Sequence, residues 1–436
     1  MTTQQTPLID GSAVSRRERW AWCGYDFANS AFTTIIVTVA YSVYFTRVVA
    51  PDGTGEAWWG RGYAASMLLA GLLSPILGAV ADATASKRRF LVVLTLACVA
   101  PTALLGLVGP GDVALGLGLF IIANVSYNAA LHLYDAFLNE LAPFSEMGRL
   151  SGWGWAFGYI GGLTSLALVY PFLAGGMEGD HAARYRLAFP ITAAFFAVAA
   201  LPTFLWVRER AVAVRRDASP WTMGVRRVGK TLRGLGRYPT LIRYFVAYFL
   251  YNDAVNTVFV FAAIFASQVL QFSAQEVVMF FIVMQVSSAA GAWGFGAVTD
   301  RLGPVRAISA TLLVLIAITV WAARVQSASE FYAIGLVTGA MLGANQASSR
   351  TLLAQFAPAG RGAEFFGLFS LTSKFAATLG PLLYGEIATA TGSHRAAVLS
   401  IGGLFLAGLV LLQRVDETKG RQEAGGVRVR HAEPLH

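Results

Sequence analysis

Two acidic residues stand inside long apolar stretches of the chain, where few charges are expected. Asp26 lies in the stretch WAWCGYDFANSAFTT, and Asp253 lies in LYNDAVNTVF. Each is followed three residues later by an asparagine, Asn29 and Asn256. An ionised carboxylate in hydrocarbon costs about 3 kcal/mol or more, so each should face protein or a water-filled cavity. The shared spacing indicates that two parts of the chain present the same polar helix face.

A polar stripe follows one face of the apolar run near residues 113–141. It consists of Asn124, Asn128, His132, Asp135 and Asn139, which fall on one arc at 3.6 residues per turn. So many polar groups are costly in a bilayer unless they line a cavity, which is our interpretation; hydrogen bonding between helices is the alternative. His132 and Asp135 have the spacing of a proton relay, although a single buried histidine is often a structural hydrogen-bonding group.

Later runs add further polar groups at similar depth. Tyr251 and Asn252 accompany Asp253, and Lys374 lies in a run that carries few other charges. A lysine near the middle of a bilayer needs a partner or water, so Asp253 and Lys374 are a candidate charge switch or, alternatively, a static ion pair. Asp26 and Asp135 lie nearer one membrane surface, where two neighbouring carboxylates would take up and release a proton.

The sequence thus predicts one polar site shared by several helices. Its candidate cavity residues are Asp26, Asn29, Asn124, Asn128, His132, Tyr251, Asn252, Asp253, Asn256, Asn345, Gln346 and Lys374. Its candidate proton-coupling residues are Asp26, His132, Asp135 and Asp253. Trp153 and Trp155 lie in a glycine-rich run and serve either for ligand stacking or for tight helix packing.

A second pattern combines glycine, aspartate and basic residues at the ends of apolar runs. Its first copy contains Gly78, Asp82, Lys87 and Arg88, and its second copy contains Gly296, Asp300, Arg301, Gly303 and Arg306. The glycines permit close helix packing, and each aspartate stands at a helix end beside a basic turn. We expect these residues to act in conformational change and not in solute binding.

These residues require membrane-spanning helices to position them. The chain has 436 residues, of which 56% are hydrophobic and only 13% are charged, which is typical of an integral membrane protein. A span needs about 20 mostly apolar residues, and the long runs are not alternating as barrel strands are. Twelve such runs lie near 20–47, 59–82, 90–109, 113–141, 150–174, 187–207, 241–267, 276–299, 304–323, 330–353, 363–390 and 396–413.

The order of these runs divides the chain into five parts. We predict an N-terminal segment at 1–19, a six-helix half at 20–207, a basic linker at 208–240, a second half at 241–413 and a tail at 414–436. The two copies of the glycine–aspartate pattern fall at matching places, so the halves are parallel repeats. Apolar and basic residues alternate in the linker at helical spacing, which predicts an amphipathic helix on the anionic leaflet; a regulatory partner site is the alternative.

Charge distribution sets the expected orientation. Most Lys and Arg residues, including Arg16, Lys87 and those of the linker, fall on one side of the spans. Both termini should therefore be cytoplasmic. The net charge of +9 follows from these loops, so no nucleic-acid partner is expected. The residues show no metal-ligand spacing, nucleotide loop or catalytic triad, so we expect no metal, no cofactor and no enzyme activity.

The motifs resemble those of a known superfamily. The first glycine–aspartate copy with its basic turn resembles the signature loop of the major facilitator superfamily, although Ala83 and Ala85 stand where that family usually has Arg and Gly. YDFANSAFTT, LYNDAVNTVF and QASSRTLLAQFAPAGRGAEFFGLFSLTSKFAATLGPLLYG are similar to one branch of it, that of the autophagy-related vacuolar amino-acid effluxer and its bacterial relatives. The resemblance covers about residues 20–413. It implies an all-α fold of twelve spans, with a loop that gates alternating access.

The function we predict is secondary active transport of a small polar solute, coupled to protons, with the proton gradient as energy source. Acidic and basic groups together make a small zwitterion such as an amino acid a reasonable solute, and the protein is expected to work as a monomer in the lipid bilayer. Three alternatives stay open: a multidrug exporter, a lipid exporter, and a membrane receptor or scaffold without transport.

Overall fold

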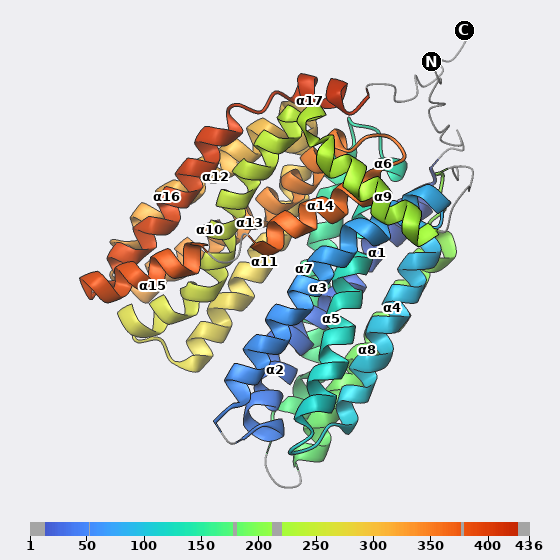
Figure 1. Ribbon diagram of the computed structural model, residues 1–436. Coiled ribbons are helices and arrows are strands. Elements are labelled where there is room, and N and C mark those ends of the chain that lie inside the picture. The colour runs from blue at the N-terminus through green and yellow to red at the C-terminus, as the bar shows by residue number, and fades with distance from the viewer. Residues whose placement is uncertain (1–13, 52, 178–180, 212–219, 376–378, 426–436) are drawn as a thin grey trace, which may run out of the picture.

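Two helical bundles lie side by side in the computed structural model, which describes residues 14–51, 53–177, 181–211, 220–375 and 379–425. Within those ranges every regular element is a helix (Figure 1). The predicted all-α fold of two six-helix halves is therefore confirmed.

The first half contains six spans. They are formed by α1 (Arg16–Ala31) with η1 (Phe32–Val39), α2 (Tyr41–Tyr44) and η2 (Phe45–Val49); α3 (Gly55–Thr84); α4 (Lys87–Leu104) with η3 (Leu105–Leu107); α5 (Val113–Ala136) with α6 (Leu138–Leu141); α7 (Met147–Leu173); and α8 (His181–Trp206). In the first span, η1 and η2 have wide π-type turns, in which the Ala40 N–H donates to the Ile35 carbonyl. Such turns are frequent at functional sites.

The second half repeats this order. It contains α10 (Pro239–Val269), α11 (Ala274–Leu302), α12 (Pro304–Ala322), α13 (Ala328–Phe356), α14 (Gly362–Phe375), α15 (Leu379–Thr391) and α16 (His394–Leu412). α9 (Pro220–Arg233) and η4 (Leu235–Arg237) lie between the halves in sequence, and α17 (Glu417–Glu423) follows the last span. The helix predicted within the linker is thus present as α9.

Eleven helical segments within the described ranges are long and apolar enough to cross a membrane. α13 is equally long but falls outside this set, because its second half carries Asn345, Gln346 and Arg350. Most of that half is buried in protein and is not exposed to lipid. With α13 included, the spans are the twelve that the sequence predicts.

Apolar side chains on the outside of the bundles match a lipid environment. Leu72 is 54% exposed and Val198 is 65% exposed, and both lie on spans. The interior of the first half is instead filled by packed rings, such as Trp59 against Phe120 with centroids 4.3 Å apart. An apolar surface around an aromatic core is the arrangement that a bilayer stabilises.

The two halves contact each other mainly at one end of the molecule. This end, where α1 begins, α3 and α11 end and α17 lies, is called the terminal face below (Figure 1). There α3 packs against α14, and α7 packs against α11. Toward the opposite end the two bundles diverge (Figure 1).

The turns after α3 and α11 occupy matching places in the two repeats. Gly303 follows α11 with φ 88°, and Ala85 follows α3 with φ 46°. Both values lie in the left-handed region, which glycine adopts without steric penalty and alanine does not. The departure from the family pattern at Ala85 therefore leaves the backbone conformation intact and adds strain.

Candidate functional site

A cluster of three ionic groups joins the two halves of the molecule. The Arg350 guanidinium of α13 donates through Nη1 to Asp26 Oδ2 of α1 at 2.9 Å and to Asp135 Oδ1 of α5 at 3.1 Å. Arg350 is 5% exposed and Asp26 is 7% exposed. Taking a lone charge out of water costs several kcal/mol, so these three groups are stable there because they neutralise one another. With both carboxylates ionised, the cluster carries one negative charge in excess.

The guanidinium is held in a fixed orientation by further contacts. Its Nε donates to Ser151 Oγ at 3.0 Å, and Nη2 donates to the Ser151 carbonyl at 2.7 Å. The rings of Trp22 and Trp155 lie 4.9 and 5.5 Å from its central carbon. Charge-assisted hydrogen bonds and aromatic faces together suit arginine better than lysine.

A cavity of about 630 Å³ opens beside this cluster. Its wall is formed by residues of α1, η1, α5, α7, α10, α11 and α13, so it lies between the halves. The first span supplies a polar side through Asp26, Asn29, Ser30, Thr33 and Thr34. This confirms the polar helix face that the sequence predicted around Asp26.

The opposite parts of the wall are more apolar. α11 contributes the apolar residues Val278, Phe281 and Ile282 and one side-chain amide, that of Gln285. Trp155 lines the cavity, whereas Trp153 stacks on Trp20 with centroids 5.1 Å apart. Packing between helices therefore holds for Trp153, and ligand stacking stays a prediction for Trp155.

Most of the predicted stripe on α5 has a different role. The Asn124 amide donates to Ser66 Oγ of α3 at 2.7 Å, and the Asn128 amide donates to the Asn124 carbonyl. His132 is buried, and the wall of the 630 Å³ cavity does not include it or the two asparagines. Packing against α3 draws this part of the stripe away from that cavity, so hydrogen bonding between helices holds for Asn124. Of the five residues in the predicted stripe, only Asp135 lines this cavity.

The predicted residues of α10 and α13 lie outside this wall too. Asn345 donates to Thr311 Oγ1 of α12 at 2.9 Å, which is a buried contact between neighbouring helices. Tyr251 Oη and Ser349 Oγ are 2.8 Å apart. Asn252, Asn256 and Gln346 are likewise not part of the wall of this cavity.

The expected ion pair between Asp253 and Lys374 is wrong for this conformation. Asp253 Oδ2 accepts the Gly380 N–H at 2.6 Å, in the first turn of α15. Lys374 Nζ instead donates to Asn128 Oδ1 of the other half at 2.7 Å. The backbone N–H of Gly380 satisfies the carboxylate, and the side-chain amide of Asn128 in α5 satisfies the lysine. Lys374 thus connects the two halves.

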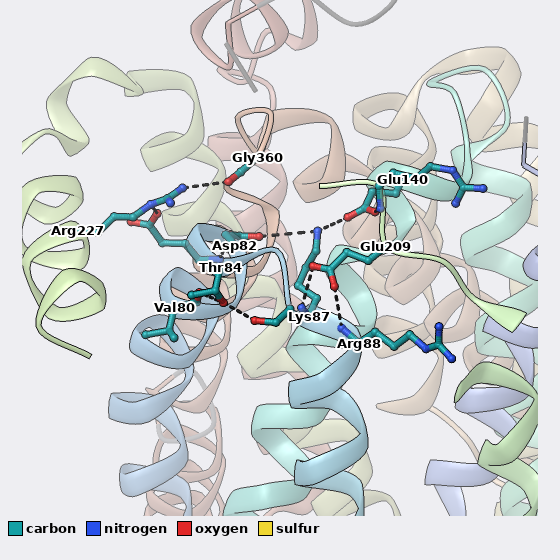
Figure 2. Close-up of polar contacts among 12 residues, drawn as sticks. Val80, Asp82, Thr84, Lys87, Arg88, Glu140, Glu209, Arg227 and Gly360 are labelled. Atoms are coloured by element: carbon teal, nitrogen blue, oxygen red, sulfur yellow. Dashed lines mark hydrogen bonds and ion pairs between the residues drawn. The ribbon is translucent and has the colours of Figure 1, made fainter. Parts of the chain in front are cut away.

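The first glycine–aspartate copy lies at the contact between α3 and α14. Asp82 Oδ2 accepts the Glu364 N–H in the first turn of α14 at 2.9 Å. Gly78 faces the Ala363 backbone so closely that a Cβ there would collide with it. Lys87 contacts Glu140 and lies 3.8 Å from Asp82 (Figure 2). A carboxylate of one half therefore caps a helix of the other.

The second copy makes the equivalent contact on the other side. Asp300 of α11 accepts the N–H groups of Gly148 and Arg149, in the first turn of α7, at 2.7 and 3.1 Å. Gly296 packs on the Gly148 backbone, which excludes a larger side chain. The two glycine–aspartate copies thus join the halves at the terminal face through two related caps.

The basic residues of these motifs are placed around the caps. Arg88 donates to the Phe204 carbonyl of α8, whereas Arg301 and Arg306 are exposed. Gly303 provides the turn between α11 and α12. The arginines therefore surround the gate without forming its core.

Two glutamates that the sequence reasoning missed support the gate within each half. Glu209, which follows α8, accepts the N–H groups of Lys87 and Arg88 at 2.8 and 3.3 Å (Figure 2). Glu417 of α17 accepts the Val305 N–H at 2.8 Å, at the matching position of the second half. Burial raises the pKa of the Glu209 carboxyl above its ordinary value, against the opposing effect of the Lys87 cation. Each caps the third span of its own half.

Arg350 and Glu364 also had no predicted role. Arg350 could have been found in the sequence, because a charge within a span needs a partner, as it does for Asp26. Glu364 is fully buried and forms two ion pairs. Its Oε2 lies 2.9 Å from Arg227 Nε of α9, and its Oε1 lies 2.8 Å from Arg361 Nη2. Its partners come from the linker and from an adjacent turn, which spacing in the sequence does not reveal.

The fold and this inter-half site define a membrane transporter of the major facilitator superfamily. Solved structures with this fold include the human organic anion transporter MFSD10, with a TM-score of 0.73 at 17% identity over 91% of this chain and 99% of that one. The proton:xylose symporter XylE has a TM-score of 0.72 at 16% identity, over 94% and 98% of the two chains.

Within that superfamily the chain belongs to the family described as "Vacuole effluxer Atg22 like", whose model matches residues 62–425. The uncharacterized MFS-type transporter YxiO of Bacillus subtilis is 28% identical over 91% of this chain and 94% of its own length. Autophagy-related protein 22 of Yarrowia lipolytica is 26% identical over 63% of this chain and 51% of its own. The family and the similar structures are transporters.

Proposed function

We propose that this protein is a secondary active transporter that moves a small polar solute by alternating access, coupled to protons. An amino acid is the favoured class of solute. The observation that carries the proposal is the Asp26–Arg350–Asp135 cluster, which lies in the wall of a cavity between the two halves.

The excess negative charge gives this cluster two ways to become neutral. A proton can bind to one carboxylate, or the ammonium group of a solute can pair with it. Either event weakens one of the two bonds to Arg350, which comes from the other half of the molecule. Proton binding and solute binding are coupled in this way, because each changes the strength of the contact between the halves.

The polar side of the first span suits the rest of such a solute. Asn29, Thr33 and Thr34 offer hydrogen-bonding groups without fixed charge. His132 and Asp253 are additional candidates for proton transfer, since both are buried titratable groups. The energy source in this proposal is the proton gradient, and no cofactor is needed.

Membrane placement completes the proposal. With both termini in the cytoplasm of a bacterial cell, the terminal face is the inner gate, and the described conformation is closed inward. The protein would work as a monomer in the inner membrane. The family description as an effluxer favours export as the direction of transport.

A second candidate is export of hydrophobic compounds or lipids. The apolar part of the wall, with Val278, Phe281 and Ile282 of α11, favours it. The polar side supplied by α1 and the ionic cluster favour the small polar solute.

Flux into proteoliposomes tests both candidates. The purified protein is reconstituted with an imposed pH gradient, and uptake of radiolabelled amino acids is compared with that of a hydrophobic dye. We expect saturable amino-acid flux that rises with the gradient. Asp135→Asn should uncouple flux from pH while the protein stays folded.

Ser309→Ala is a matched control, because its hydroxyl bonds only the Val305 carbonyl and Gln413, far in sequence from the cluster. Flux of the dye alone would favour the second candidate. Absence of flux for every solute, with a folded protein, would favour a receptor or scaffold and contradict the proposal.

A further inference from the structure

The linker helix α9 presents two different faces at the terminal face. Gly224, Arg227 and Thr231 point inward, since Gly224 faces Val80 of α3 and the other two contact Glu364. Val225 and Leu232 point outward and are 56% and 49% exposed. Figure 1 shows α9 crossing both halves at this end. An apolar strip left open to the surroundings on a basic helix is the pattern of a helix at a membrane surface.

A basic pocket lies at the C-terminal end of the same helix. Its lining consists of Lys230, Arg233, Gly234, Gly236 and Arg237, around a volume of about 390 Å³. Three cations and two glycines form this wall, and among the described residues no carboxylate contributes to it. The glycines let a ligand approach the backbone, and the cations match a phosphate in charge.

We propose that this pocket binds the phosphate of an anionic phospholipid headgroup in the leaflet beside the terminal face. The apolar strip of α9 sits at the depth of the upper acyl chains, and the pocket next to it sits at the level of the headgroups. This geometry selects a lipid, because the outward residues Val225 and Leu232 need an apolar neighbour that a soluble phosphate does not provide.

Occupation of the pocket acts on the gate through the inward face of α9. Arg227 Nε donates to Glu364 at 2.9 Å, and its Nη2 donates to the Gly360 carbonyl at 3.0 Å (Figure 2). Glu364 belongs to the first turn of α14, whose N–H group Asp82 caps. α9 therefore contacts both halves only while α3 and α14 are together. A lipid that holds α9 in place stabilises the closed terminal face.

The first experiment measures binding. The purified full-length protein in detergent is titrated with phosphatidylglycerol, with phosphatidylcholine and with soluble glycerol phosphate. The melting temperature is measured at each concentration, because a ligand that binds the folded protein raises it by mass action. The pocket variant Arg233→Gln/Arg237→Gln is compared with Arg16→Gln/Arg89→Gln, which removes the same charge from exposed positions outside the pocket. All four residues lie at the surface, so both variants should fold.

We expect phosphatidylglycerol to raise the melting temperature of the wild type and of the control. The pocket variant should bind it about 30-fold more weakly, since each basic residue near a charged surface contributes about 1 kcal/mol. Equal binding by both variants would overturn the pocket. An equal shift with glycerol phosphate would assign the site to soluble phosphates and overturn the lipid assignment.

The second experiment separates binding from coupling. Spin labels at Arg89 of α4 and Arg306 of α12, which are exposed at the terminal face on opposite halves, report the distance across it in vesicles with and without anionic lipid. Anionic lipid should favour the short distance in the wild type. Arg227→Gln should retain lipid binding and lose this shift. A shift that persists in Arg227→Gln would contradict the path through Glu364.

Discussion

A buried guanidinium with two carboxylate partners makes folding sensitive to the removal of any one of the three groups. Arg350 is the only cation that contacts Asp26 or Asp135 among the ion pairs of the described residues. Without it, two largely buried carboxylates would face each other with no other cation paired to them in the described part of the chain. Since the partners come from both halves, the loss affects the contact between the halves as well as local stability.

Arg350→Gln should therefore lower the free energy of unfolding by about 3–5 kcal/mol, as expected when one partner of a buried ion pair is removed. Chemical denaturation in detergent measures this. Arg350→Lys keeps the positive charge and should lower the free energy of unfolding by less than Arg350→Gln does. The triple variant Asp26→Asn/Asp135→Asn/Arg350→Gln removes all three charges and should regain much of the loss. A triple variant less stable than Arg350→Gln would contradict this account.

Lys374 has Asn128 as its partner, and this contact also leads to a test. A hydrogen bond to a charged group contributes about 1.5–3 kcal/mol. A double-mutant cycle of Asn128→Ala and Lys374→Met should show coupling of that order in the same denaturation measurement. The cycle of Asp253→Asn with Lys374→Met should be additive within about 0.5 kcal/mol. Strong coupling in the second cycle would restore the ion pair expected from the sequence.

These residues show where sequence reasoning reaches its limit. The cost of a charge in hydrocarbon correctly placed Asp26 on a polar face, because burial depends on the residue and its helix alone. The choice of partner depends on the rotation and tilt of two helices from different halves. Asp253 and Lys374 have comparable depths, yet α15 offers a backbone N–H to one and α5 a side-chain amide to the other. Spacing along the chain carries no such information.

At the scale of single elements, the turn between α3 and α4 stores strain at Ala85. Its φ of 46° costs an alanine about 1 kcal/mol, and Gly303 at the matching turn avoids this cost. Ala85→Gly should raise the free energy of unfolding by about that amount, detected as a higher melting temperature in detergent. Ala83→Gly, two residues earlier inside α3, is the control and should lower stability, because glycine is unfavourable within a helix.

The membrane-spanning helices were largely predictable from the sequence, whereas the contacts that cap their ends were not. Apolar runs longer than a bilayer is thick leave few alternatives, so the twelve spans follow from length and composition. The caps at Glu209 and Glu417 were not predicted, although both follow a span in matching positions. Their target N–H groups are far away in sequence and become neighbours only when the six-helix bundle closes.

At the scale of the whole molecule, two caps join the halves at the terminal face. Asp82 accepts an N–H of α14 and Asp300 accepts one of α7, so the proposed opening of the terminal face requires both bonds to break. Glu417 caps α12 within one half, so its bond to Val305 can persist during such a movement. The same chemistry therefore has different consequences for the conformational equilibrium, depending on whether the cap crosses between halves.

Asp82→Asn or Asp300→Asn should each shift the equilibrium toward an open terminal face about 5-fold, because each removes a negative charge from a helix N-terminus, which is worth about 1 kcal/mol. The double variant should shift it about 25-fold, because distant sites act additively. Distances between spin labels across the face measure the populations. Glu417→Gln should lower the melting temperature and leave the populations unchanged. A shift in Glu417→Gln equal to that in Asp300→Asn would mean that general destabilisation, and not a cap between the halves, controls opening.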